Sequence, residues 1–282
     1  MMHSTLVLGG GGLWGIGWLT GLAAGLADVG IEIRTAGTLI GTSAGSVLAA
    51  QLCGSASLEE LFQRQVDPAH QTQERATPPE ALAGLLTLWQ TPFESPQART
   101  RATSELALRT PTVSQEERRA DMAARLGSTA TAWPAQRVLK ITAVDVDSGE
   151  LHAFDATSGV ALIDAITASC AVPGVWPVVS IQGRRYMDGG VWRTPENAHL
   201  ALGAPSVLVL SPFGAALGAV TGPLEREIAE LRAAGARVTL ICADPQALAS
   251  AALGPLNPAV REPAARAGRV QGRRIAAEVR AG

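Results

Sequence analysis

The stretches Thr5–Gly12 (TLVLGGGG) and Thr38–Gly45 (TLIGTSAG) decide the fold, because each is a short apolar run that ends in a glycine-rich turn. Apolar residues with helical spacing follow both turns, from Ile16 to Val29 and again through about Cys53. Two consecutive units of strand, turn and helix are typical of a parallel sheet. The sequence therefore predicts an α/β protein, a three-layer α/β/α sandwich with a mostly parallel central sheet.

The rest of the chain divides into a polar segment and a second α/β region. Residues 55–134 are rich in Gln, Glu, Arg, Thr, Ser and Pro, whereas apolar strand and helix patterns resume from 138. We expect one domain, 1–282, with a helical cap insertion at about 55–134. Within the insertion an apolar stripe predicts one amphipathic helix face, made of Leu82, Leu85, Leu86 and Trp89.

The composition excludes several classes of function. The net charge of −2 gives no electrostatic basis for binding nucleic acid. Cys53, Cys170 and Cys242 form no CxxC pair, which argues against a disulfide framework and fits a reducing compartment. The four histidines and three cysteines show no metal-ligand spacing, so we expect no metal and no cofactor. Without a visible signal peptide or membrane span, the expected location is the cytoplasm.

The sequence GTSAG, Gly41 to Gly45, matches the G-x-S-x-G nucleophile elbow, in which a sharp turn from strand to helix exposes a serine. Ser43 would be the nucleophile, and the small residues Gly41 and Gly45 would make room for the turn. A serine in such a turn is also a common helix N-cap, so the pattern alone leaves both roles open.

The glycine run Gly9 to Gly12 distinguishes between these roles. A dinucleotide or phosphate loop can begin in the same way, but no GxxxxGK[ST] sequence and no acidic residue after the second strand follow here. If the two strands are neighbours joined by one crossover, their carboxyl ends share a sheet edge. The N–H groups of the glycine loop and of Ala44 would then point to one spot beside Ser43, as in an oxyanion hole.

Four stretches in this order resemble the patatin-like phospholipase family. They are the loop Gly10-Gly11-Gly12-Leu13-Trp14-Gly15, the elbow Gly41–Gly45, the segment Ala168–Pro173 with Trp176-Pro177-Val178, and Asp188-Gly189-Gly190. The resemblance covers roughly 1–55 and 136–245.

The resemblance implies catalysis by a Ser–Asp dyad without histidine or metal. Ser43 would be the nucleophile, Asp188 its base, and Gly10, Gly11 and Gly12 the oxyanion loop. The family usually has Arg or Lys before the last loop glycine, where this chain has Trp14. The substrate would be a phospholipid, a lysophospholipid or a neutral ester, reached through transient contact with a membrane surface. Trp14 and Trp176, beside the motifs, are candidates for the acyl pocket, although aromatic residues at such spacings also serve as core.

Other assignments stay open at this point. His199 follows Asp188 and would complete a Ser–Asp–His order, although its surroundings resemble the start of a surface helix. Asp188 could serve only the turn that Gly189 and Gly190 form after a strand. The chain could also be a non-enzymatic module that binds a nucleotide or phosphate. Oligomeric state is not predicted.

Overall fold

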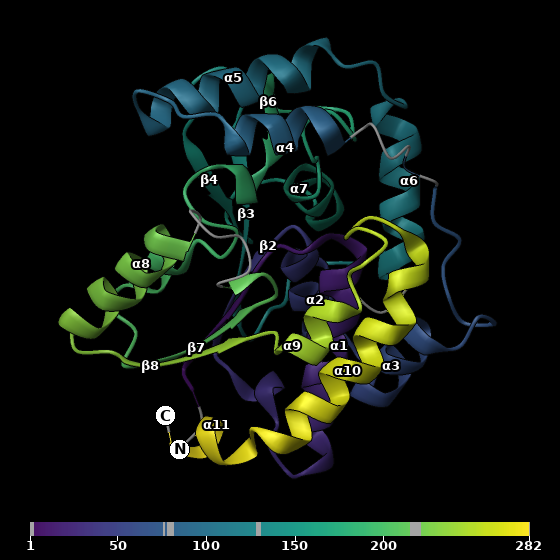
Figure 1. The fold of residues 1–282 in the computed structure, drawn as a ribbon, viewed down its shortest axis with the longest axis vertical. Helices are drawn as coiled ribbons and strands as arrows, with labels where there is room; N and C mark the ends of the chain where they lie inside the picture. Colours follow the sequence, from purple (N-terminus) through teal and green to yellow (C-terminus); the bar gives the residue numbers. More distant parts are fainter. Residues whose placement is uncertain (1–2, 76, 78–81, 128–130, 215–220, 282) are drawn as a thin grey trace.

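The computed structural model describes residues 3–281, apart from 76, 78–81, 128–130 and 215–220. The described part forms one eight-stranded mixed sheet between two layers of helices (Figure 1). The strands are β1 (Thr5–Leu8), β2 (Thr38–Thr42), β3 (Val138–Asp145), β4 (Leu151–Phe154), β5 (Val179–Ile181), β6 (Arg184–Asp188), β7 (Ser206–Ser211) and β8 (Arg237–Cys242).

The helices lie in sequence between these strands and after the last one. They are α1 (Gly12–Asp28), α2 (Ala44–Cys53), α3 (Leu58–Val66), α4 (Ala83–Gln90), α5 (Pro96–Arg109), α6 (Gln115–Leu126), α7 (Leu162–Ser169), α8 (Thr221–Ala233), α9 (Pro245–Ala249), α10 (Arg261–Arg274) and α11 (Ala276–Ala281). Short 3-10 turns are η1 (Ile33–Thr35), η3 (Gly189–Val191), η4 (Ala198–Ala201) and η6 (Pro258–Val260).

The strand order is β5-β6-β3-β2-β1-β7-β8, with β4 paired to β3 outside this path. The five strands β3, β2, β1, β7 and β8 are parallel, whereas β4, β5 and β6 join in antiparallel pairs. β1 and β2 are neighbours in the register Leu8 to Gly41, as the two glycine turns predict. Both turns therefore lie at the same edge of the sheet. The three-layer α/β/α prediction is confirmed.

Alternating side chains on the central strands build the two cores. Leu6 and Leu8 face α1, α2 and α7 in the larger core, whereas Val7 faces α8 and η4 in a second core. This alternation follows from the two-residue period of a strand. At the far end of β3, Val144 packs against Ala107 of α5 in a third cluster. Helices α5 and α8 thus cover one face, and α1, α2 and α7 the other.

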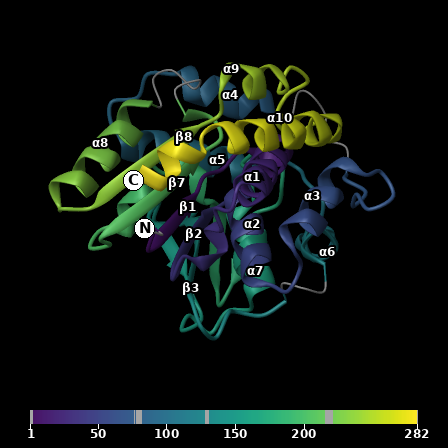
Figure 2. The ribbon, with the colours of Figure 1, turned by 90° about the horizontal axis from the view of Figure 1, so that it is seen from below.

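Helix α1 is buried on all sides because α10 covers the surface that the sheet does not (Figure 2). The two backbones touch along glycines: a Cβ atom added to Gly21 would lie 1.9 Å from the carbonyl oxygen of Ala265. Trp18 of α1 donates its indole N–H to Gln271 of α10 at 2.9 Å. α10 ends at Arg274, and a separate helix, α11, begins at Ala276.

The described residues of the 55–134 segment contribute four helices that do not share one location. α3 packs on α1 and α10, α6 on α7 and α2, and α4 on α5, which lies over the sheet. Burial along the predicted stripe is uneven, because Leu85 is 2% exposed and Leu86 is 47% exposed. Leu82 only precedes α4, and the side chain of Trp89 lies outside the described residues. That the segment is an insertion that caps the site stays a prediction.

Candidate active site

Ser43 lies at the junction of β2 and α2 with φ 51° and ψ −116°. A positive φ costs a serine about 1–3 kcal/mol, so the surrounding structure must impose it. Two residues further on, only glycine fits, since a Cβ atom on Gly45 would lie 2.0 Å from the carbonyl oxygen of Leu8. Although Ser43 occupies the N-cap position of α2, its side chain makes no capping hydrogen bond. Its hydroxyl is therefore available for another partner.

Asp188, the last residue of β6, supplies that partner. Its carboxylate interacts with the Ser43 hydroxyl and accepts a hydrogen bond from the Gly190 N–H at 2.8 Å. Burial raises the pKa of Asp188 to about 6, although both hydrogen bonds lower it. A carboxyl group with this pKa is a better proton acceptor for a hydroxyl than an exposed aspartate. Asp188 thus stabilises the turn at Gly189 and Gly190, and its carboxylate also faces Ser43.

The glycine loop reaches Ser43 from the end of β1. A Cβ atom on Gly10 would lie 3.5 Å from the Cβ atom of Ser43. The N–H of Gly10 donates to the carbonyl of Pro195 at 2.9 Å. In this structure it is therefore not free to act as the oxyanion donor that the sequence predicts. Within the described residues the N–H groups of Gly11, Gly12 and Ala44 have no such backbone partner. Gly12 has φ 63°, a conformation that glycine adopts without strain.

Two residues that the sequence analysis did not single out hold this geometry. Asn197 donates from its side-chain amide to Thr42 Oγ1 and to the carbonyl of Gly189, both at 3.1 Å. It thereby joins the elbow strand to the Asp-Gly-Gly turn. Ser169 Oγ accepts the N–H of Ser43 at 2.9 Å. Ser169 lies in one of the quoted motifs, whereas Asn197 carries no local sequence signal.

Comparison with known proteins agrees with the motif resemblance. The patatin-like phospholipase model matches residues 6–199. The chain belongs to this family. The match includes the loop, the elbow and the Asp-Gly-Gly turn, and it also spans the 55–134 segment. A search of curated proteins finds no significant match.

Among solved structures, VipD from Legionella pneumophila is similar with a TM-score of 0.47 and 13% identity, over 98% of this chain and 67% of that chain. The type III effector protein ExoU is similar with a TM-score of 0.45 and 16% identity, over 99% of this chain and 53% of that chain. The chain therefore spans about half the length of ExoU.

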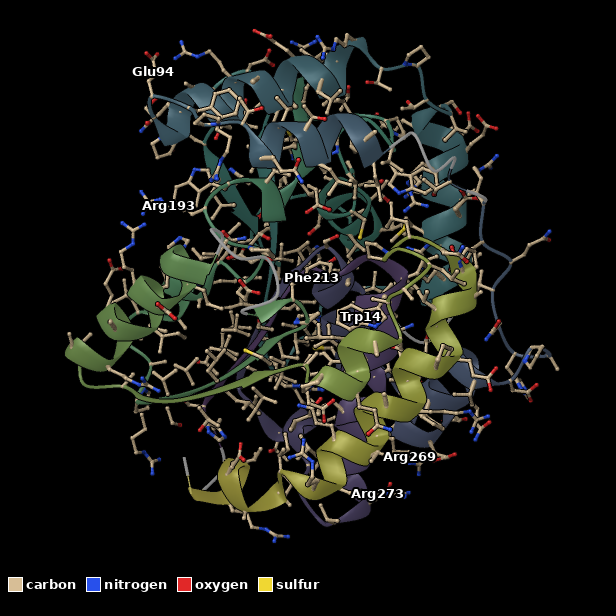
Figure 3. All side chains as sticks on the ribbon, in the orientation of Figure 1. Trp14, Glu94, Arg193, Phe213, Arg269 and Arg273 are labelled. Carbon is tan, nitrogen blue, oxygen red and sulfur yellow. The ribbon has the colours of Figure 1, made fainter. Side chains whose placement is uncertain are left out.

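Trp14 takes the place that the patatin-like pattern usually gives to a cation, and it is fully buried away from the candidate site. Its indole donates to the hydroxyl of Ser250 at 2.8 Å, and its ring stacks on Phe213 with centroids 5.5 Å apart (Figure 3). Trp14 does not line the cavity beside Ser43, unlike Trp176. The core role therefore fits Trp14, and the pocket role stays a proposal for Trp176.

His199 does not point to the serine and aspartate in this patatin-like site. Its Nδ1 lies 3.2 Å from Glu227 Oε1 of α8, and its ring packs against Trp192. It lies in η4, a short 3-10 turn rather than a regular helix. No contact links it to Asp188 among the described residues, so the geometry does not favour a Ser–Asp–His triad.

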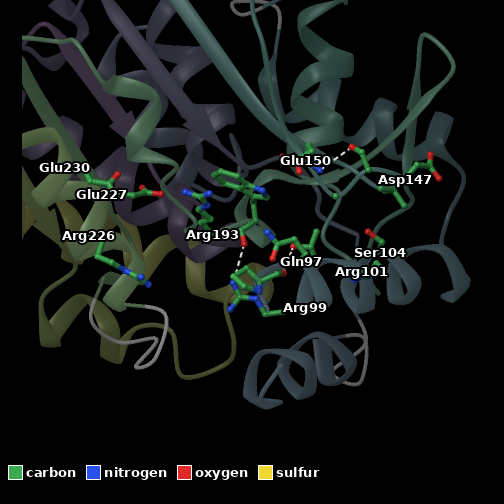
Figure 4. A pocket seen from close by; sticks show the side chains of 16 residues that line it. Gln97, Arg99, Arg101, Ser104, Asp147, Glu150, Arg193, Arg226, Glu227 and Glu230 are labelled. Carbon is green, nitrogen blue, oxygen red and sulfur yellow. Dashed lines mark hydrogen bonds between the residues drawn. The ribbon is translucent and has the colours of Figure 1, made fainter. Parts of the chain in front are cut away.

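Two of the cavities in the described part of the structure are candidates for the substrate. The larger, about 560 Å³, is lined by charged residues of α5, α8 and the turns after β3 and β6, and neither Ser43 nor Asp188 lines it (Figure 4). The smaller, about 20 Å³, is lined by Ser43, Ala44 and Gly12, and has the size of about one water molecule. The smaller cavity is therefore the relevant one for chemistry at Ser43.

In the described ranges, no three or more side chains of His, Cys, Asp or Glu form a group that could hold a metal ion. Asp145 accepts the N–H groups of Asp147 and Ser148, both at 2.9 Å, and Asp147 pairs with Arg185. The Asp145 carboxylate thus serves the turn, and the Asp147 carboxylate joins the turn to β6. In the same ranges no helix is long and apolar enough to span a membrane.

Proposed function

We propose that the chain is a serine lipid-acyl hydrolase in which Ser43 is the nucleophile and Asp188 its base. Membership of the patatin-like phospholipase family supports a lipid hydrolase. The observation that carries the residue assignment is the buried Asp188 carboxylate next to the Ser43 hydroxyl, at a serine held in a strained conformation. The substrate is a carboxylic ester with a lipid acyl chain.

In the first half of the reaction Asp188 accepts the hydroxyl proton while Ser43 Oγ bonds to the carbonyl carbon of the ester. The negative charge that forms on the carbonyl oxygen is held by the N–H groups of Gly11, Gly12 and Ala44. Each such donor is worth about 10²–10³ in kcat. The first turns of α1 and α2 add their positive dipole ends. The alcohol then leaves with the proton from Asp188, and an acyl-enzyme remains.

In the second half water attacks the acyl-enzyme carbonyl and gives one proton to Asp188. The tetrahedral intermediate collapses, the C–O bond to Ser43 breaks, and the serine oxygen takes the proton back. The acid is released and the site is restored. Both halves use the same base and the same N–H groups, so neither histidine nor metal enters the scheme.

The test is covalent labelling with a fluorophosphonate, followed by intact-mass measurement. We expect one adduct per chain on the wild type and none on Ser43→Ala. Ser57→Ala is the matched control, because Ser57 is an N-cap serine whose hydroxyl does accept the capping bond from Glu60. Labelling of a folded Ser43→Ala variant, or loss of labelling in Ser57→Ala, would overturn the assignment.

A further inference from the structure

Arg118 of α6 is a buried cation with an incomplete set of partners. Arg118 is 2% exposed, and its guanidinium lies 3.7 Å from the centre of the Trp176 ring. The distance from its Nη1 to Asp121 Oδ2 is 4.0 Å. Its Nε makes no hydrogen bond in the described part of the structure. Burying a cation with an unmatched N–H group costs free energy, so such an arrangement calls for a reason.

The side chain lines the same small cavity as the candidate nucleophile. Ser43, Trp176 and Arg118 all border this space of about 20 Å³. Thr77 borders it too, and its buried hydroxyl also lacks a hydrogen-bond partner among the described residues. Two residues that each have an unmatched hydrogen-bond donor therefore border one space beside Ser43. The Trp176 ring and Asp121 contact Arg118, but neither of them accepts a hydrogen bond from Arg118 Nε or from the Thr77 hydroxyl.

The charges around the cavity favour an anion. Among the described residues that line the space, the cations are Arg75, Arg118 and Arg125, and the acid is Glu74. Arg75 pairs with Asp121 at 3.0 Å, so Arg118 and Arg125 are the cations that this pair leaves. The Glu74 carboxylate is already shared, since it pairs with Arg125 and lies 3.3 Å from Arg261. Burial and the nearby Arg125 lower the pKa of Arg118 to about 10, so Arg118 still carries its charge at neutral pH.

We propose that Arg118 binds the phosphate group of a phospholipid or lysophospholipid substrate beside the ester that Ser43 attacks. This proposal rests on the proposed function. Arg118 would supply, from α6, a positive charge that the glycine loop lacks, since the loop has Trp14 and no Arg or Lys. A guanidinium can donate two parallel N–H bonds to phosphate oxygens, which a loop lysine cannot. Since the cavity holds about one water, the surrounding side chains must move apart to admit the phosphate.

The experiment compares two substrates that differ only in the phosphate, monolauroylglycerol and lauroyl lysophosphatidic acid. We expect the wild type to hydrolyse both and to prefer the phosphate ester. Arg118→Gln should lower kcat/KM for the phosphate ester at least tenfold more than for the neutral ester, mainly through KM. Arg118→Lys should recover part of this loss because it keeps the charge but not the paired donors. The control is Arg119→Gln, an exposed neighbour that pairs with Asp164, which should leave both activities within about twofold.

Equal losses on the two substrates in folded Arg118→Gln or Arg118→Lys would overturn the proposal, and so would no loss on either. Inorganic phosphate provides a measurement that needs no variant: it should inhibit hydrolysis of monolauroylglycerol by the wild type. Inhibition without preference for the phosphate ester would indicate a site for free phosphate and would also overturn the proposal. A wild type that hydrolyses only the neutral ester overturns this inference alone. One that hydrolyses no ester overturns the proposed function.

Discussion

The sheet edge around Ser43 and the 55–134 segment are held together by different means. At the sheet edge, the contacts are made to the backbone: Gly45 approaches the Leu8 carbonyl, and the side-chain amide of Asn197 bonds to the Gly189 carbonyl. In the 55–134 segment, short-range side-chain contacts define the helices. α3 and α6 both begin with a reciprocal capping box, Ser57 with Glu60 and Ser114 with Glu117.

The difference indicates a division of tasks. Backbone contacts fix atoms closely, which suits a nucleophile, a base and N–H donors that must hold one geometry. A side chain on a capped helix can be exchanged without disturbing the sheet edge, which suits a group that selects the substrate. Arg118 and Arg125, both on α6, are the two side chains of this kind that border the cavity at Ser43. Substitutions in the two regions, and one where α1 meets α10, measure how far this separation holds.

The largest effect is expected for Asp188→Asn, at the sheet edge. It should lower kcat by on the order of 10³ or more, because the amide cannot accept the serine proton. His199→Ala should cost less than about tenfold, since its ring contacts Glu227 and Trp192 and not the serine. Steady-state kinetics on a short-chain nitrophenyl ester measure both. A folded His199→Ala variant as inactive as Asp188→Asn would mean a triad.

The pH dependence provides an independent check of the same assignment. Since burial raises the pKa of Asp188 to about 6 and only the ionised form accepts a proton, kcat/KM should rise as pH increases through about 6. The inflection should persist in His199→Ala. Glu196 is the control: burial raises its pKa to about 7, but its carboxylate bonds to Ser211. Glu196→Gln should keep the inflection. Loss of the inflection in this variant would mean that the titrating group is Glu196 and not Asp188.

The sequence predicted the sheet edge well because its constraints are local. Gly41 and Gly45 around Ser43, and the glycines after Asp188, mark turns that few other residues permit. The adjacency of β1 and β2 followed from one crossover helix. The contribution of Gly10 was not predictable in the same way: its N–H is taken by Pro195, a residue 185 positions further along the chain.

What the sequence did not reveal depends on contacts between distant elements. Asn197 and Arg118 have ordinary sequence surroundings, and only the fold brings them to the elbow and to Trp176. Trp14 lies beside a motif and faces away from the site. The stripe at Leu85 and Leu86 has a helical period, but a period shows which residues align and not which partner covers them.

A medium effect, on stability, is expected where α1 meets α10. Gly21→Ala would bring a Cβ atom to 1.9 Å from the Ala265 carbonyl oxygen, so the two helices must separate. The free energy of unfolding should fall by about 3 kcal/mol, as overpacked cores lose about 1–3 kcal/mol or more. Gly37→Ala is the control, because its added Cβ atom meets only the Ser4 carbonyl oxygen at 3.8 Å. Urea unfolding should separate the two variants, and equal midpoints would show that the helices adjust freely.

The smallest effect is expected in the 55–134 segment, at Leu86. This leucine is 47% exposed on α4, and a half-exposed leucine can contact the acyl chains of a lipid surface. Leu86→Glu should change the free energy of unfolding by less than about 0.5 kcal/mol, because little apolar surface leaves the core. It should lower hydrolysis of long-chain esters severalfold and leave acetate esters nearly unchanged. Leu202→Glu, at an exposed leucine after η4, is the matched control and should affect neither substrate. Equal losses on long and short esters in Leu86→Glu would show that α4 supports the fold and does not select the acyl chain.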